Sequence, residues 1–341
     1  MSIGTRLGTL AYGALFTIVL PLLLAAWAVR LDRLVTLPRV GTPWGGASLA
    51  IAGALLMLAA TIALRVRGGG WPMSPFPPRR RVTGGAYALV SDPIYAGAVM
   101  LAAGCAIVLE SPAGLWIVTP LLAAACFAFV TGYEREATNA HFGPRATRPL
   151  LRLPAARDAA PDVADRLSVY LLVFLPWYLA YEGVNRLLGN PDAPQLATQW
   201  DAAIPVLGWT EPAYFLAYPF LLAVPLVART QQQLRRFTVQ GWMAIVSVTT
   251  IYLVFPTYID ARPVPPDAPF ASLMAWERAF DDHAAGFLAF HVVWAVLAAA
   301  LCARAIPRLR VLWWLLAAAI TASCVTTGMH VIADVAAALV M

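Results

Sequence analysis

Residues 45–65 read GGASLAIAGALLMLAATIALR, a run with no charged side chain before its last residue, Arg65. About 20 apolar residues in a helix are enough to cross the hydrocarbon core of a membrane. Similar runs recur along the chain. The ten candidate spans are residues 7–29, 45–65, 94–110, 112–133, 167–188, 210–228, 239–256, 285–304, 309–323 and 324–341. The last two runs are short and contiguous, so the sequence sets their boundary least firmly.

The composition agrees with this interpretation. Of the 341 residues, 60% are hydrophobic and 12% are charged, and the mean hydropathy is +0.71. Soluble domains carry about 25% charged residues, so this chain could not cover a soluble surface. The runs are continuous and rich in Leu and Ala, which favours helices over the alternating strands of a membrane barrel. We therefore predict an all-α polytopic membrane protein with about ten transmembrane helices.

The first run has a second interpretation, a cleaved secretory signal, because Ala26-Trp27-Ala28 is similar to a small-residue cleavage site. However, the run is longer than the roughly 7–15 apolar residues of a signal core. Arg30 and Arg33 also follow it directly. We therefore expect a retained first helix.

The positive charge comes entirely from arginine, because the chain has no lysine, and the formal net charge is +6. The arginines lie in loops beside apolar runs, which is the pattern of membrane topology and does not indicate a nucleic-acid partner. With ten helices, one set of alternate loops is much richer than the other. That set holds Arg6, Arg65, Arg67, Arg79, Arg80, Arg81, Arg135, Arg145, Arg148, Arg152, Arg157, Arg166, Arg229, Arg235, Arg236, Arg304, Arg308 and Arg310. The positive-inside rule places this set and both termini in the cytoplasm.

The four cysteines, Cys105, Cys126, Cys302 and Cys324, all fall within apolar runs. Their spacing is typical neither of a metal site nor of an extracellular disulfide framework. We expect them to be small buried hydrophobic side chains, and we predict no metal site.

The most polar long segment, residues 134–166, separates two membrane regions and is rich in proline. Composition shifts of this kind are typical of linkers between domains. The predicted organisation is a membrane domain of about four helices over 1–155, a cytoplasmic linker over 156–166 and a six-helix membrane domain over 167–341.

Near the C-terminus, His330 is followed four residues later by Asp334. On a helix these positions share a face, so the carboxylate can orient the imidazole as a nucleophile. By the predicted topology, His291 and Arg262 emerge on the same non-cytoplasmic face. An arginine that neutralises phosphate oxygens, with one His as nucleophile and another as acid, is typical of phosphoryl transfer.

Residues 165–341 resemble the type 2 phosphatidic acid phosphatase superfamily, and within it the branch that contains inositol phosphorylceramide synthase. The resemblance implies that His330 forms a phosphohistidine, that Asp334 orients it, that His291 is the general acid and that Arg262 binds phosphate, without a cofactor. Two positions depart from the family pattern. Leu288-Ala-Phe-His291 stands where Pro-Ser-x-His is usual, and Cys324 stands where many members have arginine.

A second group of motifs lies in the first 155 residues. Its elements are Gly85-x-Tyr87, Pro93-x-Tyr95-x-Gly97, Glu134 before Phe142-Gly143, and Leu153-Pro154. Residues 40–155 are similar to the isoprenylcysteine carboxyl methyltransferase and phospholipid methyltransferase family. The resemblance implies S-adenosylmethionine binding at the cytoplasmic face, with Tyr87, Pro93, Tyr95 and Glu134 as cofactor-binding positions. Ser91-Asp92 replaces the family's Arg-His or Arg-Asn, so an anion stands where a cation is usual.

The leading functional hypothesis is a lipid phosphatase or phosphotransferase of a bacterial inner membrane, acting at the periplasmic face through phospho-His330. Its expected partners are a lipid phosphate and the surrounding membrane lipids. Two alternatives stay open. One is an S-adenosylmethionine-dependent methyltransferase for a lipid or prenyl substrate at the cytoplasmic face, and the other is a non-catalytic lipid-binding scaffold. The sequence does not indicate an oligomeric state.

Overall fold

The structure is a computed structural model and describes residues 12–37, 39, 41–72, 74, 77–145, 147–188, 192–279 and 287–341. Its described elements are helices joined by turns and loops, with one isolated parallel bridge between Val90 and Leu151. The all-α prediction is therefore confirmed. Contacts divide the chain into two compact units, Met1–Arg152 and Leu153–Met341, which are described separately below.

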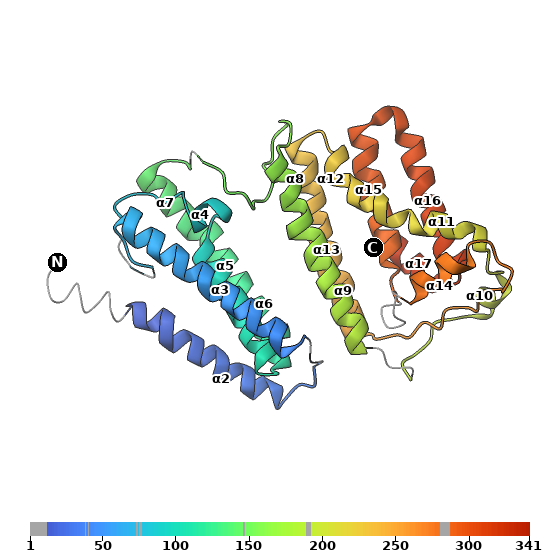
Figure 1. Cartoon of the computed structure of the whole chain (residues 1–341), viewed down its shortest axis with the longest axis horizontal. Coiled ribbons are helices and arrows are strands. Elements are labelled where there is room, and N and C mark those ends of the chain that lie inside the picture. Colours follow the sequence, from blue (N-terminus) through green and yellow to red (C-terminus); the bar gives the residue numbers. More distant parts are fainter. Residues whose placement is uncertain are drawn as a thin grey trace. The chain divides into compact units, whose positions relative to one another are not determined.

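The first unit is an antiparallel group of long apolar helices with short helices at its ends (Figure 1). Its helices are α2 (Leu20–Asp32), α3 (Pro43–Ala63), α4 (Ala86–Leu89), α5 (Pro93–Val108), α6 (Thr119–Phe129) and α7 (Arg135–Phe142). Single π-helical turns extend them: η1 (Leu15–Val19), η2 (Leu64–Gly68), η3 (Gly114–Val118) and η4 (Val130–Glu134). The turn η4 joins α6 to α7, so that the chain is helical from Gly114 to Phe142.

Four glycines bring α3 and α5 into direct backbone contact. A Cβ added at Gly53 would lie 2.6 Å from the carbonyl oxygen of Gly97, and one added at Gly104 would lie 2.6 Å from that of Gly46. On each helix the two glycines, Gly46 and Gly53 on α3 and Gly97 and Gly104 on α5, are seven residues apart, so they fall on one face. Helices in lipid associate through such small residues, because lipid gives no hydrophobic drive for helix association. This pair is the closely packed centre of the first unit.

The second unit surrounds a central helix. Its elements are α8 (Val163–Val169), η5 (Tyr170–Phe174), α9 (Leu175–Leu188), α10 (Gln199–Ala203), η6 (Gly208–Thr210), α11 (Glu211–Phe215), α12 (Ala217–Val227), α13 (Gln231–Val254), α14 (Ala271–Arg278), α15 (Phe290–Ala305), η7 (Pro307–Leu309), α16 (Arg310–Thr326) and α17 (Ile332–Val340). The central helix is α15, which is buried on nearly all sides. Its Trp294 packs against Phe174, Trp177 and Phe237 from the surrounding helices.

Among the residues that the structure describes, seven helical segments are long and apolar enough to cross a membrane. They are Tyr12–Asp32, Pro43–Gly68, Gly114–Phe142, Val163–Asn185, Gly208–Val227, Gln231–Val254 and Pro307–Thr326. Two shorter apolar helices are Pro93–Val108 and Phe290–Ala305. The chain is therefore a multi-pass membrane protein, and in its described parts nine of the ten predicted runs form apolar helices.

The tenth predicted run, residues 324–341, does not form one helix. Helix α16 ends at Thr326, the chain turns through Gly328 with φ at +79°, and α17 has only nine residues. A helix of that length is about 14 Å long, which is too short to span a bilayer. The positive φ explains the break, because a helix cannot continue through the left-handed region.

The prediction of buried cysteines was right at two positions and wrong at the other two. Cys302 and Cys324 are buried, but Cys105 is exposed on α5 and Cys126 is partly exposed. An exposed apolar side chain is ordinary on a helix that faces lipid, and the sequence of α5 does not show which face that is.

Candidate functional site

The first unit carries a polar cluster built around a hydrogen bond between Tyr95 and Glu134. The hydroxyl of Tyr95, in the first turn of α5, donates to Oε2 of Glu134 at 2.5 Å. Glu134 is the last residue of η4, at the junction with α7. Pro93 is the first residue of α5 and fixes where that helix starts. The predicted pair Tyr95 and Glu134 is thus brought together from segments 39 residues apart.

Asp92 and Tyr87 lie close enough to the Glu134 carboxylate to interact with its charge. Burial raises the pKa of Tyr87 to about 12, with further contributions from Glu134 and Asp92. Burial also raises the pKa of Asp92, and Arg135, Arg145 and Arg81 offset part of that rise. Two carboxylates and two phenols therefore share one partly buried region.

Three arginines surround this region, and the sequence did not identify them as site residues. Arg81 donates to the carbonyl of Gly143 at 2.5 Å and to the side chain of Asn139 at 3.0 Å. Arg145 donates through Nη2 to the carbonyl of Tyr87 at 2.6 Å, and its Nε is buried without a hydrogen-bond partner in the described part of the chain. Arg135 lies 4.0 Å from Asp92. The sequence offered one indication of these arginines. Asp92 places an anion where the family has a cation, so cations from other segments have to replace that positive charge.

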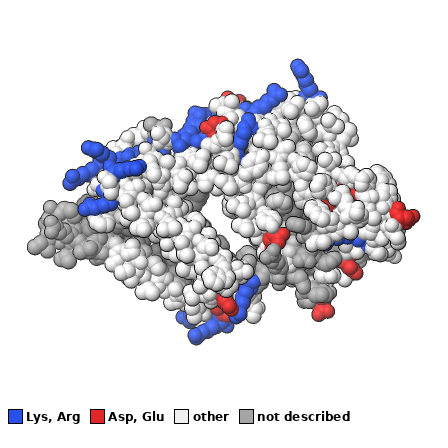
Figure 2. Space-filling model, viewed as in Figure 1, with Lys and Arg blue, Asp and Glu red and all other residues white. Residues whose placement is uncertain are grey.

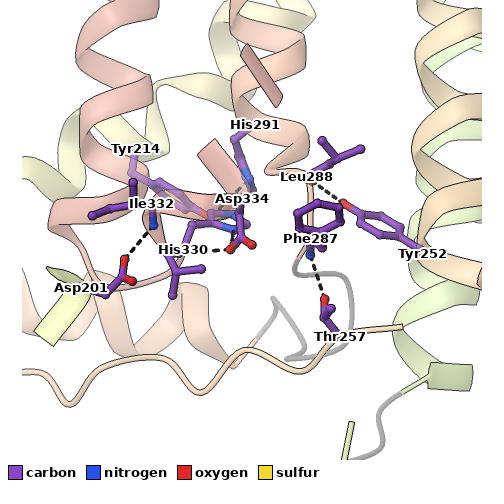
Figure 3. Close-up of polar contacts among 11 residues, drawn as sticks. Asp201, Tyr214, Tyr252, Thr257, Phe287, Leu288, His291, His330, Ile332 and Asp334 are labelled. Atoms are coloured by element: carbon purple, nitrogen blue, oxygen red, sulfur yellow. Dashed lines mark hydrogen bonds and ion pairs between the residues drawn. The ribbon is translucent and has the colours of Figure 1, made fainter. Parts of the chain in front are cut away.

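The second unit holds a deeply buried cluster, shown in Figure 3. Nδ1 of His330 lies 3.6 Å from Oδ2 of Asp334, and the two side chains are only 6% and 1% exposed. His330 precedes α17, so the assumption that both residues lie on one helix was wrong. Asp334 is in the first turn of α17, where Oδ2 also accepts from the backbone N–H of Val331 at 3.1 Å. The turn before α17 therefore brings His330 and Asp334 together, and not a helix that contains both residues.

Both ring nitrogens of His330 are buried and lack a hydrogen-bond partner among the described residues. The backbone fixes the position of this residue instead, because its N–H donates to the carbonyl of Cys324 at 2.9 Å. Leaving a buried polar group unsatisfied costs about 1–3 kcal/mol. Native structures rarely leave a buried imidazole unsatisfied, so this position is a candidate site for a polar ligand.

His291 lies beside His330, with ring centroids 5.8 Å apart. It lies in the first turn of α15, and two tyrosines contact its ring. Nδ1 lies 3.3 Å from the hydroxyl of Tyr214, and Nε2 lies 3.1 Å from that of Tyr218. Tyr214 is fully buried and also faces His330, with ring centroids 6.5 Å apart. The predicted pair of histidines is therefore close in space, with two tyrosines that the sequence had not singled out.

Arg262 has a structural role that the sequence did not predict. Its Nη1 donates to the carbonyl of Asp201 at 2.8 Å and to that of Ile204, and its Nη2 donates to Val325 at the end of α16. Its backbone N–H donates to Gly328 at 3.1 Å. Arg262 thus holds the turn that leads to His330, and its function as a phosphate ligand stays a prediction.

A second arginine, Arg278 at the end of α14, reaches the same turn. Its Nη2 donates to the carbonyl of Thr327 at 2.9 Å, while its Nε is buried without a partner in the described part of the chain. A Cβ added at Gly328 would lie 3.1 Å from Cβ of Arg262 and 3.4 Å from Nη2 of Arg278.

Burial lowers the pKa of Arg278, Glu211 raises it again, and Arg262 lowers it. The carboxylate of Glu211 is 1% exposed, and its Oε2 has no hydrogen-bond partner among the described residues. Two arginines and a carboxylate therefore gather beside the histidines. Sequence reasoning missed Glu211 and Arg278, although a charged residue in or beside an apolar run is itself an indication of function.

Comparison with known proteins identifies one part of the chain. Residues 42–145 match the phospholipid methyltransferase family, and the matched range includes the whole cluster of the first unit, from Arg81 to Arg145. No curated protein and no solved structure gives a significant match to the chain. The chain is thus a multi-pass membrane protein with a phospholipid-methyltransferase-like segment.

Proposed function

We propose that the first unit is an S-adenosylmethionine-dependent methyltransferase acting on a membrane lipid. The main support is that the segment matching the phospholipid methyltransferase family also contains the Tyr95–Glu134 pair and its three arginines. This was the alternative interpretation of the sequence, and the comparison favours it over the leading hypothesis. The bacterial inner membrane and the cytoplasmic side remain proposals.

The residues of the cluster fit the charges of S-adenosylmethionine. Its carboxylate pairs with guanidinium groups, and Arg145 has a buried Nε donor that no described residue uses. Its ammonium and sulfonium cations suit the carboxylate of Glu134. When bound, the cofactor supplies an electrophilic methyl group.

The protein's own groups would orient the bound molecules and neutralise their charges. The Tyr95 hydroxyl holds the Glu134 carboxylate in one position, and the arginines keep a lipid phosphate or the cofactor carboxylate at the same edge. A lipid nucleophile that carries a headgroup amine would lose its proton to a nearby carboxylate. Tyr87 and Pro93 lie where they would support this edge of the cluster.

Two measurements test the proposal. Titration calorimetry in detergent measures S-adenosylmethionine binding, and transfer of a labelled methyl group measures activity on amine-headgroup phospholipids in nanodiscs. We expect Glu134→Gln and Arg145→Gln to lower transfer by about 10²-fold, because each removes one charge from the cluster. The control is Arg148→Gln, an exposed arginine of the same loop. If wild-type protein neither bound the cofactor nor transferred a methyl group, the first unit would be a non-catalytic domain.

A second function is favoured by a separate observation, the unsatisfied His330 beside Asp334, His291 and two arginines. We propose phosphoryl transfer from a lipid phosphate. A His330 nitrogen attacks phosphorus, the phosphorus–oxygen ester bond breaks, and the leaving oxygen takes a proton from the His291–tyrosine group. Water or an alcohol then attacks the phosphohistidine, which restores the imidazole. This proposal applies the resemblance to the phosphatidic acid phosphatase superfamily.

Release of phosphate from short-chain lipid phosphates tests this second function. We expect His330→Ala to abolish release and Arg278→Gln to lower it by about 10²-fold, because a buried guanidinium stabilises the charge on phosphate. His141→Ala, which changes a histidine of the first unit, is the control. Unchanged release by the His330→Ala protein would exclude a phosphohistidine at His330, and no release by the wild-type protein would leave a lipid-binding scaffold as the role of the second unit.

A further inference from the structure

A cavity of about 250 Å³ lies between α13 and α15 in the second unit. Its polar lining includes Arg236 and Gln240 of α13, Arg304 of α15, and Asp158 of the segment before α8. Figure 2 shows arginines gathered along the upper edge of this unit, over the ends of these helices. The cavity therefore belongs to the arginine-rich edge of a membrane-embedded helical group.

The cavity is far from the histidine cluster. His291 and Arg304 lie near opposite ends of α15, 13 residues apart, which is about 20 Å along a helix. The residues that line it are separate from those proposed for phosphoryl transfer. Its chemistry is therefore independent of both proposed functions.

The charged groups of the cavity suit one anionic ligand that also carries hydroxyl groups. The guanidinium groups of Arg236 and Arg304 have no hydrogen bond or ion pair in the described part of the chain, so both are free to bind an anion. With Asp158, the lining carries one net positive charge, which matches a phosphodiester. Arginine donates to phosphate oxygens in a two-pronged geometry, and Asp158 can accept from ligand hydroxyls.

Glutamines add donors for the same ligand. Oε1 of Gln233 already accepts from the backbone N–H groups of Arg229 and Thr230, at 2.8 and 3.2 Å. Its amide N–H groups are left as donors on a residue that lines the cavity, and Gln232 and Gln240 contribute two further amides to the lining. Amide and carboxylate side chains together are suited to a polyol headgroup.

The wall below these groups is apolar and continues into the membrane. Phe237 and Leu301 line the cavity. On α13, Arg236, Gln240 and Met243 follow at helical spacing, and Met243 is 65% exposed. A phosphate held by the arginines would thus have its acyl chains beside an exposed apolar stripe. Basic pockets between transmembrane helices bind anionic lipid headgroups in this way.

We propose that this cavity is a binding site for the headgroup of an anionic phospholipid whose headgroup carries hydroxyls, of the phosphoglycerol or phosphoinositol kind. The lipid is held as a ligand at the arginine-rich edge, with its phosphodiester between Arg236 and Arg304. No covalent step is involved.

Native mass spectrometry and titration of the full chain in detergent test this site. The probes are dihexanoyl phosphatidylglycerol, dihexanoyl phosphatidylcholine and free glycerol 3-phosphate. We expect the anionic lipid to bind at least about tenfold more tightly than the zwitterionic lipid and than glycerol 3-phosphate, because only it offers both net charge and chains. Arg236→Gln with Arg304→Gln should weaken binding about tenfold or more.

The matched control is Arg308→Gln with Arg310→Gln, two exposed arginines near the same edge that do not line the cavity. It should bind the lipid as wild type does. If the Arg236→Gln, Arg304→Gln protein folds poorly, Arg236→Lys with Arg304→Lys replaces it in the test and should recover part of the affinity. Equal weakening in the control would overturn the proposal in favour of general surface charge. Glycerol 3-phosphate binding as tightly as the lipid would overturn the lipid assignment, and wild-type affinity of the Arg236→Gln, Arg304→Gln protein would overturn the site.

Discussion

The two polar clusters of this protein differ in how they are built and in how they are related to known proteins. The cluster of the first unit is partly exposed, is held by hydrogen bonds such as Tyr95–Glu134 with Nε of Arg145 left without a partner among the described residues, and lies within a matched family segment. The cluster of the second unit is deeply buried and has unsatisfied atoms on His330, Glu211 and Arg278, outside any matched segment. Similarity to a family therefore identifies one site, whereas burial and unsatisfied polarity identify the other.

The largest effect is expected from Gly104→Leu in the first unit. Its Cβ would lie 2.3 Å from the backbone nitrogen of Ala50, so α3 and α5 must separate. Overpacking of this kind costs about 3 kcal/mol or more where the obstacle is backbone. We expect loss of S-adenosylmethionine binding and a lower melting temperature.

Gly132→Leu serves as the control, because a Cβ there meets no atom within 4 Å. Phosphate release by the second unit should persist in the Gly104→Leu protein, since its core is formed by its own helices. If Gly104→Leu melted like wild type, the close glycine packing would not be what stabilises the first unit.

Asp334→Asn should act on chemistry more than on stability. The amide oxygen can still accept from the N–H of Val331, but it cannot stabilise a positive His330 as a carboxylate does. We expect phosphate release to fall by about 10²-fold or more with a small change in melting temperature. A variant that loses stability and activity in proportion would show that Asp334 only caps α17.

Asp201 offers a test by pH. Burial alone would raise its pKa, but hydrogen bonds from Ile332 and Thr198, together with Arg262, hold the pKa below its ordinary value of 3.8. This stabilisation exists only in the folded state, so it is present above pH 3.8 and is lost as the pH falls further. Melting temperature measured against pH should show that loss, and Asp201→Ala, at a cost of about 1–3 kcal/mol, should remove it. A wild-type profile identical to that of the variant would contradict this role.

Asp92 should modulate the affinity of the first unit for S-adenosylmethionine. Burial raises the pKa of Asp92, so its carboxyl takes up a proton at a higher pH than an exposed aspartate does. Neutral Asp92 competes less with the cofactor carboxylate for Arg135 and Arg145. Affinity for S-adenosylmethionine should therefore rise as the pH falls through the raised pKa, and Asp92→Asn should bind about threefold more tightly without that dependence. Weaker binding by Asp92→Asn would assign this carboxylate to the cofactor's cations instead.

The smallest effect is expected at Arg39, which pairs with Glu110 at 2.8 Å in the first unit. Both side chains are more than half exposed, and such pairs contribute about 0–1 kcal/mol. Arg39→Gln should leave both activities and the melting temperature nearly unchanged. A large loss in either assay would mean that exposed charge matters more than the buried clusters.

The sequence by itself determined the class of fold and part of each site. Runs such as residues 45–65 predict helices because a chain in lipid must satisfy its backbone hydrogen bonds internally. The short spacings of His330 to Asp334 and of Pro93 to Tyr95 limit how far apart these residues can lie. Each of these inferences uses local spacing, which any sequence displays directly.

Only the tertiary structure decided which residues complete the sites and what Arg262 contacts. Tyr214 lies 77 positions from His291 along the chain, and Arg278 lies 49 positions from Thr327. Contacts at such separations leave no periodic signal, because they depend on how whole helices pack. The turn at Gly328 is a similar case: the apolar pattern of residues 324–341 continues through it, but a positive φ and two neighbouring arginines end the helix before His330. Hydrophobic runs therefore set the helices, and the polar sites were set by packing between them.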